Sequence, residues 1–322
     1  MNIPFVSILI PAFRPDWLDT AIASALAQTH QNCEILISDD CPTEQVHSVV
    51  SKWEDSRIRY MRNPLRGLPG SNRDNLIAQA KGSYLKFLFD DDFLMPNSIE
   101  ILLQTCIEND AKLVFHNRHV VDEKGIQITS TTEHTLFGSG GHVVLTREVF
   151  AEEIIKPMFN RIGEPSNVLI HTSTLKKMHL PFSIGDRRMR FLTDVALYTN
   201  FASAGHRIVG ISKFGSAFRK HTRQASNGSF PGFSAAIYEW ELLRRWATDK
   251  NMMSMASFAS GIAQQKTFYQ RHVKDFPELE AFISLRNDAN YFPLVNKDFL
   301  HALQLADCSI AMRMLAIAQK YK

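Results

Sequence analysis

The sequence predicts an α/β protein with a mostly parallel sheet flanked by helices. The first observation is that short β-rich apolar runs alternate with helical segments along the first third of the chain. The second is that polar clusters follow three of these runs, at residues 11–14, 39–40 and 90–92. The carboxyl ends of parallel strands share one edge of a sheet, where such folds bind ligands, so the clusters mark the expected site.

Five short runs rich in β-branched and aromatic residues predict strands. They lie at residues 5–10, 34–38, 57–60, 84–89 and 112–119. Helices are expected between them, with Pro15 in the first turn of the first helix. The expected helices cover residues 15–28, 43–53 and 71–80, and a further one starts near Pro96.

The second half of the chain carries fewer signals. Residues 120–230 are irregular, apart from a helix expected at 191–204, closed by Gly205, and an apolar run at 208–218. From about residue 233 the pattern is helical. Apolar helical stripes usually pack into a core, so packing is expected there, while a homodimer surface or a lipid-docking surface stays an alternative.

Composition restricts the class of protein. The 322 residues, 45% hydrophobic and 21% charged, suffice for one large domain with an appendage or for two domains. The formal net charge is +3 and the basic residues are scattered, which argues against a nucleic-acid partner. Basic residues beyond position 231 permit contact with a membrane-bound acceptor.

Cysteine usage and hydropathy predict a cytoplasmic protein. The four cysteines have neither metal-ligand nor redox spacing, so free thiols in a reducing compartment are expected. The first residues do not combine a charged segment with an apolar one, and no run approaches about 18 apolar residues. No membrane span is therefore expected, and any membrane contact would be peripheral, at the inner face.

Three consecutive carboxylates, Asp90, Asp91 and Asp92, directly follow the run at 84–89. Adjacent carboxylates repel each other and raise one another's pKa values, a cost that a divalent cation removes. Mg²⁺ and Mn²⁺ bind one or two carboxylates together with phosphate oxygens, and a diphosphate leaving group needs such neutralisation. The pattern predicts an Mn²⁺ or Mg²⁺ site, with a solvated acidic turn before the next helix as the alternative.

Other polar positions suit a nucleotide and a reacting hydroxyl. A carboxylate at Asp40 can accept a hydrogen bond from a pyrimidine N3–H, or can form a turn. Arg73 can reach a phosphate or a sheet-edge carboxylate, or can form a surface ion pair. Asp194 can act as a general base or cap its helix. Arg219 and His221 can bind a diphosphate, complete a metal shell, or belong to a basic loop.

In chain order, these segments resemble the large inverting glycosyltransferase family two, which has the GT-A fold. The segments that carry the resemblance are 6–13, 24–29, 34–40, 72–75 with 80–84, and 87–92 followed by Pro96. The resemblance covers about residues 5–225. It implies a GT-A, Rossmann-like sheet with a catalytic domain at 1–230 and a helical C-terminal region at 231–322. The nucleotide-sugar half would end near residue 120, and the acceptor half would follow it.

The resemblance assigns roles around the nucleotide position by position. Pro11, Phe13 and Asp40 would frame the base, with the Phe13 ring packed on it. Arg73 would help to hold the base and the ribose, and Asp90 would face the ribose.

The same resemblance assigns roles to the residues around the metal, the diphosphate and the acceptor hydroxyl. Asp91 would bind the metal, with Asp92 beside it as a second ligand. Asp194 matches the acidic residue of the family's E-D motif, which is the catalytic base. Arg219 and His221 match a Y-R-x-H segment near the diphosphate.

The sequence departs from the family pattern at three positions. Phe89 stands where many members carry the first Asp of the metal motif, so the carboxylate of residues 90–92 that touches the metal is open. Thr193 replaces the usual Glu of the E-D motif, and Asp74 stands where Asn is usual. Residues 163–166 resemble a segment that lines the acceptor side in some members.

The resemblance implies transfer of a sugar from a nucleoside diphosphate sugar to an acceptor hydroxyl with inversion, in bacterial surface glycan biosynthesis. A carboxylate facing the base suits uracil, so a UDP-sugar is the expected donor, and a glycan or lipid-linked molecule is the expected acceptor. One alternative is an inactive member that binds a nucleotide sugar or a partner. The other is a sugar nucleotidyltransferase, which would need a Gly-rich phosphate loop where residues 11–14 stand.

Overall fold

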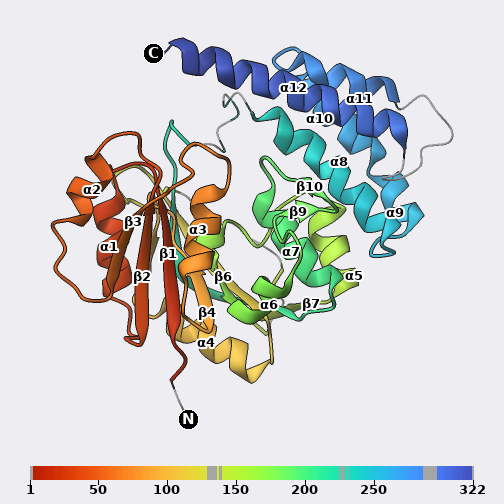
Figure 1. Cartoon of the computed structure of the whole chain (residues 1–322). Helices are drawn as coiled ribbons and strands as arrows, with labels where there is room; N and C mark the ends of the chain where they lie inside the picture. Colours follow the sequence, from red (N-terminus) through yellow and green to blue (C-terminus); the bar gives the residue numbers. More distant parts are fainter. Residues whose placement is uncertain are drawn as a thin grey trace. The chain divides into compact units, whose positions relative to one another are not determined.

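The computed structural model of the chain divides into two compact units (Figure 1). The structure describes residues 3–128, 136–137, 140–224, 226, 228, 230, 232–285 and 296–320. The first unit comprises Met1–Leu145, Ile162–His179 and His206–His221. The second comprises Thr146–Arg161, Leu180–Gly205 and Thr222–Lys322. The expected division near residues 120 and 230 is a division by function and stays a prediction.

The first unit is built on a mixed sheet of mostly parallel strands. Its strand order is β3-β2-β1-β4-β8-β6-β11-β5, with β7 paired to β11. Six strands point the same way: β1 (Val6–Ala12), β2 (Cys33–Asp39), β3 (Ile58–Arg62), β4 (Tyr84–Phe87), β6 (Leu113–Val121) and β11 (Ile208–Arg219). Three run the opposite way: β5 (Phe93–Leu94), β7 (His142–Leu145) and β8 (Val168–His171). The predicted α/β class is confirmed.

Helices cover this sheet and explain why its central strands are continuous apolar runs. The helices of the first unit are α1 (Leu18–Leu26), α2 (Gln45–Val50), α3 (Ser71–Gln79), α4 (Ser98–Glu108) and α6 (Thr172–Lys177). All of β2 is buried, as strands with both faces covered must be. Leu18, Ala21, Ile22 and Ala25 of α1 belong to the same core as the buried residues of β1 and β2.

The sheet differs from the sequence prediction in several strands, and two of the differences bear on the site. The strand expected at 84–89 ends at Phe87, because the Phe89 N–H donates to Ser166 Oγ (3.1 Å) instead of to a neighbouring strand. The strand β8 was not expected at all, and it separates β4 from β6 as an antiparallel insertion.

Gly82 lies where the chain enters β4 and touches the backbone of β1. A Cβ at this position would lie 2.4 Å from Ser7 N and 2.8 Å from Val6 C. The site is also fixed by hydrogen bonds, since Ser7 Oγ accepts from Gly82 N–H (2.8 Å) and donates to Glu34 (2.6 Å). Neither backbone atom can move without disturbing the β1–β4 pairing.

We therefore expect Gly82→Ala to lower the free energy of unfolding by about 3 kcal/mol, the upper end of the usual cost of overpacking. A urea titration measures this difference. Gly140→Ala is the matched control, because the nearest atom to its Cβ would be His142 Nδ1 at 3.9 Å, an ordinary contact. Equal stability of the two variants would contradict the close approach at Gly82.

The second unit is mainly helical. Its elements are α5 (Arg147–Phe150), a π-helical turn (Ala151–Ile155), the hairpin of β9 (Ser183–Ile184) and β10 (Arg187–Arg188), α7 (Thr193–Ser203), α8 (Ser234–Asp249), α9 (Met255–Ser260), α10 (Ile262–His272), α11 (Glu280–Ser284) and α12 (Lys297–Lys320). The helix expected at 191–204 is α7, and Gly205 follows it with φ 74°. The helical pattern expected beyond residue 233 is also confirmed.

The C-terminal helices have a core of their own. The ring of Phe282 stacks on Tyr238 (5.4 Å between centroids) and on Tyr269 (5.3 Å). The buried Arg245 donates to Glu241 Oε1 (2.7 Å), and Tyr269 donates to Glu241 Oε2 (2.6 Å). In the part of the chain that the structure describes, no helix is both long and apolar enough to cross a membrane.

Candidate functional site

The polar clusters recognised in the sequence lie at one edge of the first unit's sheet. The strands β1, β2 and β4 are parallel neighbours, with Ala12 opposite Asp39 and Leu9 opposite Phe87. Their carboxyl ends therefore bring residues 11–14, 39–40 and 90–92 to the same edge, which is where α/β folds place ligands.

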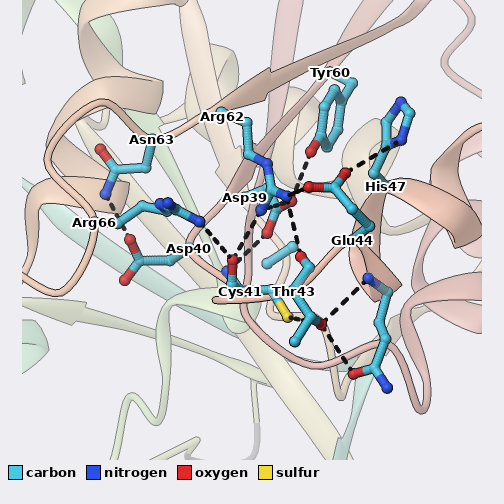
Figure 2. Close-up of polar contacts among 12 residues, drawn as sticks. Asp39, Asp40, Cys41, Thr43, Glu44, His47, Tyr60, Arg62, Asn63 and Arg66 are labelled. Carbon is cyan, nitrogen blue, oxygen red and sulfur yellow. Dashed lines mark hydrogen bonds and ion pairs between the residues drawn. The ribbon is translucent and has the colours of Figure 1, made fainter.

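Asp39 closes β2 as a buried structural anchor (Figure 2). Its carboxylate accepts hydrogen bonds from Cys41 N (2.7 Å) and from the Tyr60 hydroxyl (2.6 Å), and it pairs with Arg62 Nη1 (2.9 Å). Burial, followed by the hydrogen bond to Asp39, raises the pKa of Tyr60 well above its ordinary value. Asp39 has its acceptor positions directed at these groups, so it shapes the turn rather than presenting a free carboxylate.

Asp40 is the half-buried member of this acidic pair. Its Oδ1 accepts from Asn63 Nδ2 (2.8 Å), as Figure 2 shows. It also accepts, more weakly, from Gly67 N (3.4 Å). Gly67 has φ 79°, a conformation that favours glycine. Asp40 thus ties the end of β2 to the loop at residues 63–70.

The other residues expected around a nucleotide base lie on β1 and α3. Pro11 is the half-buried penultimate residue of β1, and Phe13 follows that strand with 49% of its surface exposed. Arg73, in the first turn of α3, donates through Nε and Nη2 to Asp74 Oδ1 (3.2 and 3.0 Å). Asp74, which stands where Asn is usual in the family pattern, is therefore an ion-pair partner of Arg73.

Asp90 links the end of β4 to the end of β1. Its Oδ2 accepts from both Phe13 N and Arg14 N, each at 2.7 Å. Burial, together with the charge of Asp91, raises the pKa of Asp90 to about 6 in spite of these two donors. Asp90 therefore braces the backbone at Phe13 and Arg14.

Asp92 is fully buried in the first unit. Its Oδ2 accepts from Ser166 Oγ (2.6 Å), and its Oδ1 accepts from the backbone N–H of Arg219 (3.1 Å). Burial and the nearby charges of Asp91 and Glu164 raise its pKa well above the ordinary value. Asp92 thus connects the acidic turn to β11 and to the segment before β8.

A second buried group lies under this turn. Lys86 of β4 donates through Nζ to the carbonyl of Ser166, and burial lowers its pKa to about 7. Nearby, Arg118 Nε pairs with Glu164 Oε1 (3.2 Å), and burial raises the pKa of Glu164. Lys86 stands alone in an apolar run, so the sequence pattern does not mark it as part of the site.

Asp91 is the carboxylate of the three that is paired with a histidine. Its side chain is 17% exposed, and its Oδ2 lies 3.0 Å from His221 Nε2. The His221 ring contacts the Trp17 ring, with 4.6 Å between centroids. Nothing in the sequence singled out Trp17, because its contact partner lies more than two hundred positions further along the chain.

Arg219 supports the acidic turn through hydrogen bonds to backbone carbonyls. Its Nε donates to the carbonyl of Asp91 (2.9 Å), and its Nη1 donates to the carbonyls of Asp122 (3.1 Å) and Glu123 (2.9 Å). The guanidinium also lies over the Trp17 ring (5.3 Å), and burial lowers its pKa. These contacts make Arg219 a support for the acidic turn.

The pair of Asp91 and His221 fits a divalent cation that shares its shell with phosphate. Mg²⁺ and Mn²⁺ typically use one or two carboxylates together with substrate oxygens, and imidazole is a less usual ligand for them. Among the described residues there is no group of three or more His, Cys, Asp or Glu side chains arranged for a metal. A two-ligand site completed by a diphosphate is therefore the arrangement that these residues could provide.

Asp194 belongs to the second unit, in the first turn of α7. Its Oδ2 accepts from Asn160 Nδ2 (2.8 Å), and its Oδ1 accepts from Val195 N (2.8 Å). The N-cap of α7 is Leu192, so the expectation that Asp194 caps the helix is wrong. An acid here still gains from the helix dipole.

Comparison with protein families gives one match that covers half of the chain. The model of Glycosyl transferase family 2 matches residues 7–173. This range includes β1 to β4, the acidic turn and β8, and thus the sheet edge described above.

Curated relatives are similar to the N-terminal part of the chain. An uncharacterized glycosyltransferase of Rickettsia felis is 39% identical over 137 residues, which are 42% of this chain and 22% of that protein. A GalNAc(5)-diNAcBac-PP-undecaprenol beta-1,3-glucosyltransferase of Campylobacter jejuni is 36% identical over 35% of this chain and 38% of that protein. The chain thus spans well under two thirds of these relatives.

Solved structures are similar over nearly the whole chain. A crystal structure of S. aureus TarS 1-349 has a TM-score of 0.61 with 15% identity, over 93% of this chain and 80% of that one. The complex of the same protein with UDP-GlcNAc has a TM-score of 0.58, over 95% and 81%. At this identity the likeness concerns the fold alone.

Proposed function

Since the chain belongs to glycosyl transferase family 2, we propose that it transfers a sugar from a UDP-sugar to an acceptor hydroxyl with inversion at the anomeric carbon. The observation that carries the proposal is the Asp91–His221 pair at the sheet edge of the first unit. The acceptor we propose is a glycan or lipid-linked molecule of bacterial surface glycan assembly. Relatives named as glycosyltransferases for undecaprenol-linked glycans, including the Campylobacter jejuni enzyme, support this choice of acceptor.

We assign Mn²⁺ or Mg²⁺ to Asp91 and His221, with Asp92 and Arg219 as supports that fix Asp91. When bound, the cation supplies positive charge that stabilises the departing nucleoside diphosphate. The buried Asp92 orients the turn through its bonds to Ser166 and Arg219, so its contribution to the metal is indirect. Under this proposal, Asp91 is the carboxylate of the three that meets the metal.

The nucleoside would lie against Phe13 and Asp40. The exposed ring of Phe13 offers an apolar face on which a base can stack. Asp40 accepts from Asn63 at one oxygen, and a carboxylate here can also accept from the N3–H of uracil. Pro11, Arg73 and the brace Asp90 would complete the base and ribose side.

In the second unit, we assign proton transfer to Asp194. As the acceptor oxygen attacks the anomeric carbon, the Asp194 carboxylate takes the hydroxyl proton and the bond to the diphosphate breaks. Asn160 holds the carboxylate through its Oδ2. We include in this proposal a peripheral contact with the inner face of a membrane, which would bring a lipid-linked acceptor to the enzyme. A homodimer stays a prediction.

Thermal unfolding with a panel of nucleoside diphosphates, with and without Mn²⁺, tests the donor site. A ligand that binds the native state raises its stability by mass action, by about 2.7 kcal/mol at a hundred times its Kd. We expect UDP to raise Tm in the presence of Mn²⁺, and TDP and GDP to raise it less. Absence of a shift with every nucleotide, with and without metal, would contradict the donor site.

A further inference from the structure

The carboxylate of Glu239, in the middle of α8, accepts hydrogen bonds from three consecutive backbone N–H groups. Its Oε1 accepts from Arg190 N (2.5 Å), and its Oε2 accepts from Phe191 N (3.0 Å) and Leu192 N (2.7 Å). The side chain is 1% exposed. A buried carboxylate is costly unless its oxygens are satisfied, and here backbone donors of one segment satisfy them.

These three N–H groups lie directly before α7. The N–H groups of Arg190 and Phe191 precede the N-cap of α7, and that of Leu192 belongs to the N-cap residue itself. The N-cap of α7 is Leu192, which has no side chain that could accept a hydrogen bond. Glu239, from another helix, therefore fixes the backbone that leads into α7 and places a carboxylate at its N-terminal end, where negative charge is favourable.

A second contact holds the same segment. Asp307 of α12 accepts from Arg190 Nε (2.8 Å) and from the Tyr238 hydroxyl (2.9 Å), and it also pairs with Arg187 of the β9–β10 hairpin. The chain from β10 to the start of α7 is thus fixed by two C-terminal helices. Asp194 follows Leu192 by two residues, so its backbone position depends on this attachment.

Burial raises the pKa of Glu239 to about 7, although its three backbone donors favour the charged form. An apolar side chain of similar size would avoid this cost in a helix core. Stability of the helix core alone would therefore not favour a carboxylate at this position. A carboxylate is needed here to accept from the three N–H groups before α7.

We propose that Glu239 is a positioning residue for sugar transfer, which holds the start of α7 so that Asp194 meets the acceptor hydroxyl in one orientation. The proposal rests on the function assigned above to Asp194. It also gives the C-terminal helices a role in the reaction, because α8 and α12 carry the side chains that fix the segment before α7.

Glu239→Gln tests the proposal, because the amide keeps the size of the side chain while its NH₂ group opposes backbone donors. We expect kcat to fall about tenfold to a hundredfold, the scale of a small misplacement of a reacting group. The Kd for UDP with Mn²⁺ should change less than twofold. Amide hydrogen exchange in residues 190–196 should become faster.

Glu278→Gln is the matched control. Glu278, in a 3-10 turn (Pro277–Leu279), also has a buried carboxylate, but its partners Ser234 Oγ (2.6 Å) and Arg313 Nη1 (2.8 Å) lie outside residues 190–196. This variant should lose stability without the loss in kcat or the faster exchange in 190–196. An equal fall of kcat in both variants would show a general effect of stability and overturn the proposal.

The double variant Asp194→Asn with Glu239→Gln separates positioning from an independent effect. Residues that act through one group are not additive, so we expect no further loss of kcat beyond that of Asp194→Asn. Multiplied losses would overturn the proposal. If Glu239→Gln fails to fold, Glu239→Asp replaces it, because aspartate keeps the charge but shortens its reach. We expect Glu239→Asp to lower kcat, and an unchanged kcat would overturn the proposal.

The two proposals can fail separately. If Asp194→Asn keeps full activity, the assignment of the base is wrong, whatever Glu239 does. If the wild-type chain binds UDP without transferring sugar, the proposed function fails, and amide exchange in Glu239→Gln then decides whether Glu239 orders the start of α7. Unchanged exchange there would overturn the positioning role on its own.

Discussion

Asp194→Asn is expected to lower kcat for sugar transfer by about a thousandfold, within the range that general base catalysis contributes. The substitution removes the proton acceptor but keeps the shape of the side chain. Its amide oxygen can still accept from Asn160 Nδ2, while its NH₂ group then faces Val195 N, so the start of α7 loses one of these two hydrogen bonds. Initial rates at saturating donor and acceptor measure the loss, with Tm recorded in parallel.

The control for this substitution lies in the same unit. Asp186 is an exposed carboxylate in the turn between β9 and β10, so Asp186→Asn removes the same charge without touching Asp194. It should keep more than half of the wild-type kcat. If Asp194→Asn loses less than threefold, another group accepts the proton and the assignment of the base is wrong.

Asp91→Asn is expected to abolish the Mn²⁺-dependent rise in Tm that UDP gives to the wild type. The amide has no negative charge, so it binds a divalent cation far more weakly than a carboxylate does. The contact between residue 91 and His221 can persist, and Asp90 and the buried Asp92 keep their own hydrogen bonds. The loss should therefore concern the ligand and not the fold.

Asp110→Asn is the control, because Asp110 is an exposed carboxylate after α4 that pairs with Lys112 (2.7 Å). It should keep the full shift. Chelation of the metal from the wild type should reproduce the behaviour of Asp91→Asn. A variant that keeps the complete Mn²⁺-dependent shift would remove Asp91 from the metal site.

The α/β fold could be predicted because burial is recorded in the sequence of its central strands. Because β1 and β2 are covered on both faces, their sequences are continuous apolar runs. The polar residues that follow these runs indicate the edge of the sheet. The strand β8 could not be predicted in this way. It has four residues, and its partners Tyr84 and Leu113 are more than fifty positions away.

The types of the site residues were predictable, but their separate tasks were not. Three adjacent aspartates look equivalent in the sequence, while their hydrogen-bond partners divide them into the braces Asp90 and Asp92 and the histidine-paired Asp91. In the same way, Arg219 was expected near a diphosphate, and its guanidinium in fact donates to backbone carbonyls. Such distinctions depend on packing between distant segments, which local pattern does not contain.

The position of β8 has a consequence for the order in which the sheet can form. Because β8 pairs with both β4 and β6, these two strands keep unpaired edges until residues 168–171 have been synthesised. Unpaired edges are templates for association between chains, and distant strand pairings form late in folding. The nascent chain must therefore extend some eighty residues past β4 before its central sheet is complete, a stage at which chaperone protection matters most.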